Sequence, residues 1–397
     1  MPTSSGPGAL RVVADENIPC VQEAFGQLGP VELRAGHEID AATVREADVL
    51  LVRSVTDVGA KLLAGSTVQF VGSATIGTDH VDQAYLAEQN IAFAHAPGSN
   101  ADSVADYVVT ALLTLARRKR VRLAGQTVGI VGCGNIGGRL ARRLPALGLD
   151  VLCNDPPRAE TEASDGAHPF HSLPTVLDAA DILTLHVPLT TDGPHRTHRL
   201  IGEEELRRLR REAWLLNTSR GEVLAPEALR EAMDEGQLGG LVLDVWPNEP
   251  VPDPELLRAA DIATPHIAGY AYDGKVRGTV MLHRALCAHL GVEASWDPEA
   301  VLQPETPERL QCVPPDPNVP PTDALHRLAR QGYDLMRDDA RLRATLNQPE
   351  GERGAAFSRL RKTYPRRYEF QRHRVPRFSV PDALRSAVTD GLTMRLG

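Results

Sequence analysis

The chain has 397 residues, 24% of them charged, and a formal net charge of −9 at pH 7. At roughly 100–200 residues per domain, this length predicts two to four domains with enough chain to bury a core. The acidic balance gives no general attraction for a polyanion, and the sequence contains no basic binding element, so we expect no nucleic-acid binding.

Cysteine usage and hydropathy exclude further classes. The N-terminus lacks the basic start and apolar stretch of a secretory signal, and no apolar run approaches the ~18 residues of a membrane span. We therefore expect a cytoplasmic protein without membrane association. The five cysteines contain no CxxC pair, which argues against a disulfide framework or a zinc site. They are Cys20, Cys133, Cys153, Cys287 and Cys312.

One cluster resembles metal ligands by composition. Asp79, His80 and Asp82 lie close together, but the acidic residues fit better in the first turn of a helix. We expect no metal.

Short apolar runs alternate with helix-like segments through most of the chain, which is typical of parallel α/β sheets. The first series comprises 11–15, 48–52 and 68–72. The second comprises 127–131, 150–155, 181–187, 214–217 and 240–245. The sequence therefore predicts two doubly wound, Rossmann-like domains. The run at 103–116 is long, apolar and free of Gly and Pro, so we expect a buried helix that links them, with a hinge there.

The composition changes after about residue 295. Residues 296–397 contain 17 Lys+Arg against 14 Asp+Glu, a net charge of +3, whereas the first 295 residues carry −12. The proline-rich stretch 313–323 indicates an extended connection, because proline fixes φ and removes a donor. Apolar residues then recur at roughly helical spacing, which predicts an amphipathic helix over 325–346 in a third, C-terminal module. They are Leu325, Leu328, Leu335, Met336, Leu342 and Leu346.

A GxGxxG motif directly follows the predicted strand 127–131 and precedes a helix-like segment. The first glycine, Gly132, permits a tight turn, Gly134 lets backbone N–H groups approach a pyrophosphate, and Gly137 allows close helix–strand packing. The complete βαβ context makes a dinucleotide site much more probable than a glycine turn of an unrelated fold.

The acidic residue of such a site is expected about 20 residues beyond the motif. Asp155 lies 18 residues after Gly137, at the end of the next predicted strand. Its carboxylate would accept hydrogen bonds from the adenine ribose hydroxyls and repel a 2′-phosphate, so the sequence favours NAD. The nearby Arg158 keeps NADP open as an alternative.

Three residues with catalytic chemistry follow later predicted strands, where α/β sheets bind ligands. The planar guanidinium of Arg220 suits the carboxylate and C2 oxygen of a 2-hydroxy or 2-oxo acid. His266 can take the hydroxyl proton while hydride leaves the carbon. Glu249 can orient the imidazole and favour its protonated form. Each residue alone would more often be structural, but together, after a dinucleotide loop, they indicate hydride transfer.

These motifs resemble those of the D-isomer-specific 2-hydroxyacid dehydrogenases, whose Arg, Glu and His trio matches Arg220, Glu249 and His266. The resemblance implies that Asp244 binds the nicotinamide carboxamide and that Gly269 lies beside the cofactor. It also implies a substrate-binding domain at 1–102 and 273–294, which includes a returning helix at about 273–293, and an NAD-binding domain at 103–272. Further expected cofactor contacts are Asn135, Ile136, Val187, Thr218 and Ser219.

Within the family, segments 191–198, 265–270, 274–279, 333–343 and 360–370 resemble the branch that oxidises 4-phospho-D-erythronate in vitamin B6 biosynthesis. That resemblance implies a C-terminal α+β module, 295–397, that forms a homodimer. The tail from about 371 departs from the pattern of that branch.

The same branch implies contacts of Ser54, Thr75 and Tyr270 with the substrate, and we consider Arg53 a candidate for its phosphate. Two alternatives stay open: a dehydrogenase for 3-phosphoglycerate or hydroxypyruvate, and an NAD-sensing protein of the corepressor type.

Overall fold

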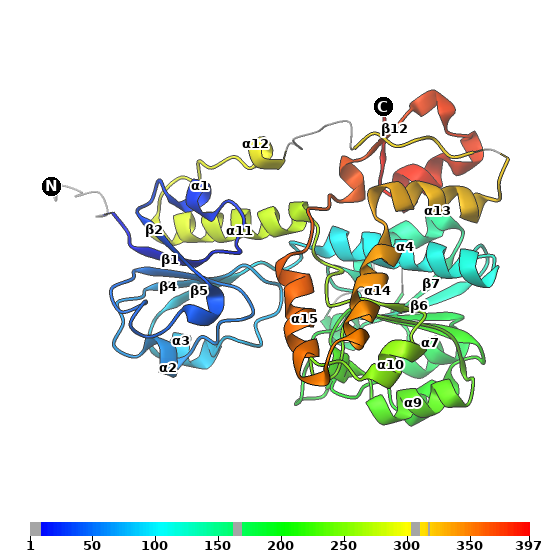
Figure 1. The fold of residues 1–397 in the computed structure, drawn as a ribbon, viewed down its shortest axis with the longest axis horizontal. Coiled ribbons are helices and arrows are strands. Elements are labelled where there is room, and N and C mark those ends of the chain that lie inside the picture. The colour runs from blue at the N-terminus through cyan, green and yellow to red at the C-terminus, as the bar shows by residue number, and fades with distance from the viewer. Residues whose placement is uncertain (1–8, 162–168, 303–309, 317) are drawn as a thin grey trace. The chain divides into compact units, whose positions relative to one another are not determined.

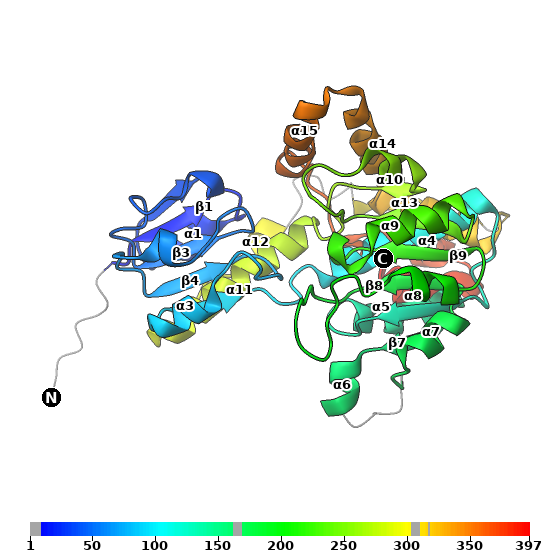
Figure 2. The ribbon, with the colours of Figure 1, turned by 90° about the horizontal axis from the view of Figure 1, so that it is seen from below.

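The computed structural model describes residues 9–161, 169–302, 310–316 and 318–397. The chain folds into two compact units, which are drawn in Figures 1 and 2. The first comprises Met1–Asn100 with Tyr272–Glu305, and the second comprises Ala101–Ala271 with Thr306–Gly397. Each unit contains an open sheet of parallel strands, which confirms the predicted α/β class. None of the helices in the described ranges is long and apolar enough to cross a membrane.

The first unit has a five-stranded parallel sheet with the order β2-β1-β3-β4-β5. Its strands are β1 (Val12–Asp15), β2 (Val31–Arg34), β3 (Val49–Val52), β4 (Phe70–Ser73) and β5 (Ala92–His95). Its helices are α1 (Val21–Phe25), η1 (Gly36–Glu38), α2 (Ala60–Leu63), α3 (Gln83–Glu88), α11 (Tyr272–Leu290) and α12 (Glu299–Leu302). The returning helix therefore forms as expected. The sequence did not reveal β2 and β5, the two edge strands, because neither is an apolar run that is buried on both faces.

Helix α11 covers one face of this sheet in Figure 1. Leu282 and Leu286 on the helix are fully buried and belong to the same core cluster as Val12 and Leu51 of the sheet. A Cβ atom at Gly72 would lie 2.8 Å from a methyl of Leu51 and 3.3 Å from one of Leu282. The glycine thus leaves room for helix and sheet side chains to fill the same space.

The second unit has a six-stranded parallel sheet with the order β11-β10-β9-β8-β6-β7. Phe170 adds a single bridge to Cys153 on the outer side of β7. The strands are β6 (Thr127–Val131), β7 (Asp150–Asn154), β8 (Ile182–Leu185), β9 (Ala213–Asn217), β10 (Leu238–Leu243) and β11 (Ile262–Ala263). With Phe170 counted as the third strand, the chain order reverses between β6 and β8, as in a Rossmann fold. The GxGxxG motif lies at this switch point.

The helices of the sheet domain lie in two layers. They are α4 (Ala101–Lys119), α5 (Gly137–Arg143), η2 (Leu144–Leu147), α6 (Pro156–Thr161), α7 (Leu173–Ala179), α8 (Glu203–Arg208), η3 (Gly221–Val223), α9 (Pro226–Asp234) and α10 (Pro254–Ala259). One core cluster joins α4 and α5 to the sheet, and a second joins α7 to α10. Helix α4 is buried along nearly all of Ala101–Ala116, as its apolar sequence predicted.

The C-terminal segment continues this unit. Its helices are α13 (Pro321–Gly332), α14 (Leu335–Ala344), η5 (Thr345–Asn347), α15 (Glu350–Lys362), η6 (Phe370–Arg372), η7 (Arg377–Ser379), η8 (Asp382–Leu384) and the π-helical η9 (Ala387–Gly391). Strands β12 (Arg374–Val375) and β13 (Arg395–Leu396) pair in parallel. In both views α14 and α15 lie side by side (Figures 1 and 2). The prediction of one helix over 325–346 was wrong, because Gly332 ends α13 and Tyr333 adopts an extended conformation.

The apolar face of this segment is buried within its own unit. Leu325, Leu328, Leu335 and Leu342 are at most 5% exposed and belong to the two core clusters. Helix α13 packs against α4, on the side that faces away from the sheet. These leucines therefore have their partners within the same chain.

Buried polar contacts also join the C-terminal segment to the sheet domain. Asp339 on α14 accepts a hydrogen bond of 2.8 Å from the backbone N–H of Ala263, in the edge strand β11. Arg343 donates to the carbonyls of Leu257 and Ala260 at the end of α10, over 2.8 and 2.6 Å. These contacts satisfy an exposed strand edge and a helix end, which explains why 306–397 groups with the NAD-binding domain.

Candidate active site

The glycine turn has the geometry that the motif requires. Gly132 has a φ of +88°, and a Cβ atom there would lie 2.7 Å from the backbone of His186. At Gly137 a Cβ atom would lie 2.0 Å from the carbonyl oxygen of Gly132. No heavy atom lies within 4 Å of a Cβ at Gly134, so its surroundings stay open for another group. The three glycines therefore have the tight turn, the close packing and the open surroundings that the motif requires.

Three other predicted cofactor contacts lie in this turn or beside it. Asn135 is exposed, and Ile136 packs against the core from a partly buried position. Val187 follows β8, and a Cβ at Gly132 would lie 2.9 Å from its side chain. Burial lowers the pKa of the neighbouring His186 to about 3, so this ring is neutral at pH 7.

Asp155 lies at the carboxyl end of β7 and is tied to the glycine turn. One carboxylate oxygen accepts a hydrogen bond of 2.8 Å from the backbone N–H of Cys133. The other accepts from the N–H of Arg158 over 3.3 Å. The Arg158 guanidinium donates to the carbonyl of Cys133 and lies 5.3 Å from the centre of the Phe170 ring. These contacts hold the carboxylate beside the turn, where it can meet a ribose.

A buried amide shapes the loop that bears Arg220. The side chain of Asn217, at the end of β9, accepts from the N–H and the hydroxyl of Ser219 over 3.0 and 2.8 Å. Its NH₂ group donates to the carbonyl of Arg220 over 2.8 Å. Thr218 contacts the ring of His186 at 3.2 Å. The guanidinium of Arg220 is partly exposed and donates to the carbonyl of Ser219.

The Arg220 loop lies directly against the loop that bears Glu249. A Cβ at Gly221 would lie 2.0 Å from the carbonyl carbon of Trp246. The two backbones can approach this closely only because residue 221 is glycine. Glu249 follows three residues later, and one of its carboxylate oxygens accepts from the Trp246 N–H over 3.0 Å.

Asp244 fixes the loop that bears His266. Its carboxylate is buried and accepts hydrogen bonds from the hydroxyl of Thr264 and from the N–H groups of Ile267 and Ala268, over 2.6, 2.8 and 2.9 Å. Its backbone carbonyl accepts from the N–H of His266 over 2.7 Å. His266 has a φ of +57°, a conformation that costs free energy for a residue with a side chain. The successive bonds to Asp244 hold the loop in this conformation.

The resulting geometry joins Glu249 to His266. The second carboxylate oxygen of Glu249 lies 2.8 Å from Nδ1 of the imidazole, and the two side chains are 22% and 30% exposed. Burial alone would raise the pKa of Glu249, but His266, the Trp246 N–H and the guanidinium of Arg361 together lower it. Glu249 is therefore ionised at pH 7 and accepts a hydrogen bond from Nδ1–H, which leaves Nε2 for chemistry.

Two further predicted residues follow His266 in the same loop. Gly269 and Tyr270 are partly exposed. The ring of Tyr270 meets the ring of Tyr364 edge to face, with centroids 5.7 Å apart, and its hydroxyl accepts from Arg361. The structure thus brings Arg220, Glu249, His266 and Tyr270 together on loops of one unit.

The remaining substrate candidates belong to the first unit. Arg53 and Ser54 follow β3, and Thr75 follows the neighbouring strand β4, so all three lie at the carboxyl edge of that sheet. The Thr75 hydroxyl donates to the carbonyl of Gly77 over 2.7 Å and lies 2.7 Å from the hydroxyl of Ser73. Arg53 is partly buried and Ser54 is exposed.

Two residues that shape the site were missed from the sequence. Asn217 was part of a predicted strand, and its role depends on a loop that folds back on it. Tyr107, which is fully buried in α4, contacts the hydroxyl of Thr264 at 2.7 Å and so extends the hydrogen bonds of Asp244. The position of Asn217, directly before the Arg220 loop, could have indicated its role in the site. Tyr107 gives no such indication, because its sequence context is that of any aromatic residue in a core.

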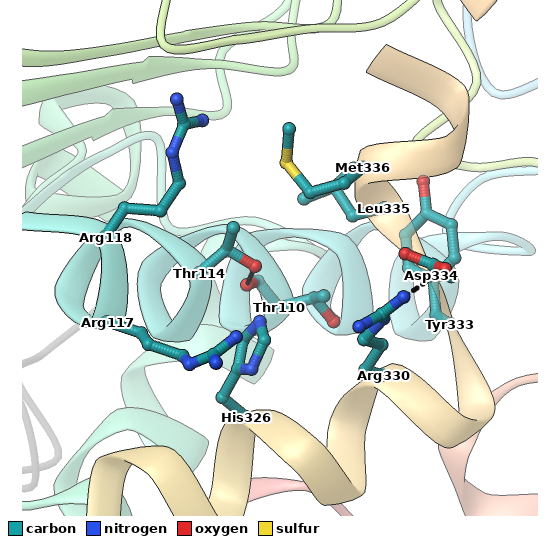
Figure 3. Close-up of a pocket in the computed structure, with 10 residues that line it drawn as sticks. All are labelled: Thr110, Thr114, Arg117, Arg118, His326, Arg330, Tyr333, Asp334, Leu335 and Met336. Atoms are coloured by element: carbon teal, nitrogen blue, oxygen red, sulfur yellow. Dashed lines mark hydrogen bonds and ion pairs between the residues drawn. The ribbon is translucent and has the colours of Figure 1, made fainter. Parts of the chain in front are cut away.

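A separate pocket contains none of the predicted site residues. It lies between α4, α13 and the start of α14 (Figure 3). Its arginines are partly neutralised, because Arg117 pairs with Asp323 at 3.4 Å and Arg330 pairs with Asp334 at 3.2 Å. Nor do the described residues contain a group of three or more His, Cys, Asp or Glu side chains that could hold a metal ion.

Comparison with family models identifies both parts of the second unit. Residues 113–268 match the NAD binding domain of the D-isomer specific 2-hydroxyacid dehydrogenases. Residues 307–383 match a domain of unknown function, DUF3410. The first match confirms the family resemblance that was found in the sequence.

Similar proteins extend this result over nearly the whole chain. An erythronate-4-phosphate dehydrogenase of Salinibacter ruber is 57% identical over 98% of this chain and 99% of its own. One of Azotobacter vinelandii is 48% identical over 92% and 94%. Among solved structures, the TT0316 protein of Thermus thermophilus has 29% identity and a TM-score of 0.63, over 72% of this chain and 98% of its own. The D-lactate dehydrogenase of Aquifex aeolicus, complexed with NAD and lactic acid, has 26% identity and a TM-score of 0.60, over 70% and 95%.

Proposed function

The chain belongs to the family of erythronate-4-phosphate dehydrogenases, and on this premise we propose that it oxidises 4-phospho-D-erythronate at C2 with NAD. The product is 2-oxo-3-hydroxy-4-phosphobutanoate, an intermediate of vitamin B6 biosynthesis. The observation that carries this proposal is the Glu249–His266 pair, in one unit with the glycine turn and the Arg220 loop.

His266 acts as the general base. Glu249 is ionised and accepts from Nδ1, so Nε2 takes the proton of the C2 hydroxyl. The hydrogen bonds that Asp244 accepts from the backbone N–H groups of residues 266–268 hold the imidazole in place before substrate binds. Preorganisation of this kind lowers the cost of reaching the transition state.

Arg220 binds the substrate carboxylate and polarises the C2 oxygen. A guanidinium can donate two parallel hydrogen bonds to a carboxylate, which fixes the orientation of C2. Asn217 holds the loop of Arg220 through its backbone.

The residues of the glycine turn fit a dinucleotide. The open space at Gly134 admits a pyrophosphate, and Asp155 is held where it can accept from ribose hydroxyls. NAD, when bound, supplies the acceptor for the hydride of C2. One Asp244 carboxylate oxygen accepts a single hydrogen bond, so it retains capacity for the nicotinamide carboxamide. The remaining proposed contacts are Asn135, Ile136, Val187, Thr218, Ser219 and Gly269.

The substrate's other polar atoms are assigned to Arg53, Ser54, Thr75 and Tyr270. Support for the first three is their common position at the carboxyl edge of the first sheet.

A panel of substrates tests the proposal. Purified enzyme and NAD are assayed with 4-phospho-D-erythronate, 3-phosphoglycerate and unphosphorylated D-erythronate, and with hydroxypyruvate and NADH in the reverse direction. We expect the highest kcat/KM for 4-phospho-D-erythronate. A higher value for 3-phosphoglycerate or hydroxypyruvate would leave the dehydrogenase class intact and refute the substrate. NAD binding without turnover of any substrate would favour the corepressor alternative.

We also propose that the protein is a cytoplasmic homodimer that associates through its C-terminal segment. Phe378 is 98% exposed and Val313 is 70% exposed, and both lie close in sequence to backbone that pairs at Arg374. A second copy that covered these two side chains would remove their apolar surface from water, which supports this location of the interface. None of the five cysteines, all of which are described, forms a disulfide, which fits a reducing compartment.

Sedimentation equilibrium tests the interface. Phe378→Ser should weaken the dimer, whereas Val251→Ser, a substitution at an exposed valine outside this segment, should leave it unchanged. Equal dimer affinity in both variants would place the interface elsewhere.

A further inference from the structure

Helix α15 brings one guanidinium to the candidate active site. Nε of Arg361 donates to the hydroxyl of Tyr270 over 3.1 Å, and its guanidinium carbon lies 5.7 Å from the centre of that ring. Tyr270 follows His266 by four residues in the same loop. All these residues belong to the second unit, so this contact does not depend on how the units are arranged.

The charge of Arg361 acts on the catalytic groups. Burial lowers the pKa of Arg361, but Tyr270, Glu249 and Asp244 raise it above its ordinary value, so the guanidinium is always charged. In return, its charge helps to lower the pKa of Glu249. Arg361 is thus a cation close to the residue that orients the general base.

Arg361 has donors that are not used within the described structure. It is partly buried, and among the described residues it makes no ion pair and its hydrogen bond goes to a neutral hydroxyl. Arg343, on the preceding helix, differs because it bonds a carboxylate and two backbone carbonyls. A partly buried guanidinium without a carboxylate partner retains its capacity for an anion.

Packing around Arg361 fixes its position. Tyr364 meets the ring of Tyr270 edge to face and donates to Asp338 over 2.7 Å. Arg367 lies 4.0 Å from the centre of the Tyr333 ring and donates to the carbonyl of Ala268 over 2.9 Å. These contacts attach the residues directly after α15 to Tyr270 and Ala268, in the loop of His266.

We propose that Arg361, with the hydroxyl of Tyr270, binds the phosphate of the substrate. This inference rests on the proposed function, in which the substrate has an anion at each end. Arg220 takes the carboxylate, so a second cation must take the phosphate, which carries about −1.5 to −2 charges at pH 7. We assign the phosphate to Arg361 in place of Arg53, because Arg361 donates to Tyr270 within the unit that contains His266. Arg53 then remains a contact for the other polar atoms of the substrate. A guanidinium suits phosphate oxygens, and a phenol adds a further donor. The C-terminal segment thus contributes a specificity residue to the active site.

Kinetics with two substrates test the assignment. We compare the unmutated enzyme with Arg361→Ala and Arg361→Lys, using 4-phospho-D-erythronate and D-erythronate. A lost charge-assisted contact lowers kcat/KM by roughly 10- to 100-fold. Arg361→Ala removes the charge beside Glu249 for both substrates, so the test is their difference: kcat/KM for the phosphorylated substrate should fall at least tenfold further than kcat/KM for erythronate. Arg361→Lys should recover part of the loss. Arg359→Ala removes an exposed guanidinium from the same helix and should have no effect.

Inorganic phosphate provides a second readout. It should inhibit the unmutated enzyme competitively against 4-phospho-D-erythronate, and Arg361→Ala and Arg361→Gln should raise its inhibition constant at least tenfold. Thermal unfolding and NAD binding show whether each variant is folded. If Arg361→Ala is not folded, the kinetics of Arg361→Lys and Arg361→Gln test the assignment in its place.

Three outcomes would overturn the inference. Equal losses for both substrates, with a shifted acid limb of the pH–rate profile, would mean that Arg361 acts through Glu249. An unchanged substrate preference and phosphate inhibition in a folded variant would make Arg361 structural. Failure of the unmutated enzyme to oxidise 4-phospho-D-erythronate would refute the proposed function itself, and the variants are not needed to recognise that result.

Discussion

Replacement of Asp244 by asparagine tests how the base is held. The carboxylate accepts from Thr264, Ile267 and Ala268, and it is 1% exposed. Asparagine keeps the shape of the aspartate side chain, but its NH₂ group faces at least one of these three donors and cannot accept a hydrogen bond from it. The affected N–H loses a bond to a charged group, worth about 1.5–3 kcal/mol, and stays buried without a partner at a further cost of about 1–3 kcal/mol. The total, about 2.5–6 kcal/mol, is a large part of the 5–15 kcal/mol typical of a domain.

Part of this cost should appear as loss of the active conformation of the loop. His266 has a positive φ, so it relaxes when the hydrogen bonds of Asp244 weaken. If about 2 kcal/mol falls on this equilibrium, kcat falls roughly 30-fold. The measurements are kcat, the KM for NAD and Tm. We expect Asp244→Asn to lower kcat and Tm together.

Thr264→Val separates this positioning role from cofactor binding. Valine has a similar shape, but it cannot donate to Asp244 or accept from Tyr107. The variant should reproduce part of the loss in kcat and Tm with an unchanged KM for NAD. If Asp244→Asn raises only that KM, and Thr264→Val behaves like the unmutated enzyme, Asp244 binds the carboxamide and does not position His266.

Four further expectations follow from the structure. His266→Asn should lower kcat by roughly 10²–10⁴-fold with nearly unchanged NAD affinity, as measured by fluorescence titration; near-normal turnover would exclude it as the base. Asp155→Ala should weaken NAD and relax the bias against NADP, whereas equal use of both cofactors by the unmutated enzyme would contradict its role. The folded-state pKa of His186 lies below the ordinary 6.5, so between about pH 6.5 and 3 the unfolded state binds a proton that the folded state does not. The free energy of unfolding therefore falls with falling pH in this window, by at most about 1.4 kcal/mol per pH unit. Denaturant titrations of His186→Gln at several pH values should show a weaker dependence of this free energy on pH. Truncation after residue 294 should yield little folded protein in circular dichroism and limited proteolysis, because it uncovers α4 and β11; a stable, NAD-binding fragment would contradict this.

Sequence patterns predicted the helices and strands whose burial repeats regularly along the chain or is the same on both faces. The strands 127–131 and 214–217 are buried on both faces, and such strands appear as continuous apolar runs. The glycine spacing is informative for a similar reason, since each glycine meets a steric demand that no other residue satisfies. The edge strands β2 and β5 were invisible because an edge position imposes no such pattern.

The trio of the candidate site was predictable because its chemistry is rare. Arg220, Glu249 and His266 each follow a strand, and the carboxyl ends of parallel strands meet at one edge. The roles of Asn217 and Arg361 were not predictable. The contacts of the Asn217 amide depend on how the following loop folds back, and those of the Arg361 guanidinium depend on where α15 packs. Tyr270 was expected at the substrate, but its contact with Arg361 depends on how α15 packs.

The C-terminal segment shows most clearly what a sequence pattern leaves open. The spacing of Leu325, Leu328 and Leu335 indicates an apolar face, but it does not identify what covers that face. In the structure, the covering surface is α4 of the same chain, and buried polar contacts add to it. Asp106 accepts from the N–H of Phe370 over 2.8 Å, and Arg143, which pairs with Asp106, donates to the carbonyl of Gly391 over 2.9 Å. Charged groups are buried this way only when their partners are held in place, so the segment and the sheet domain must fold together. A module that folds with the catalytic unit can place a side chain at the substrate, which a separate dimerisation domain could not do without a fixed interface.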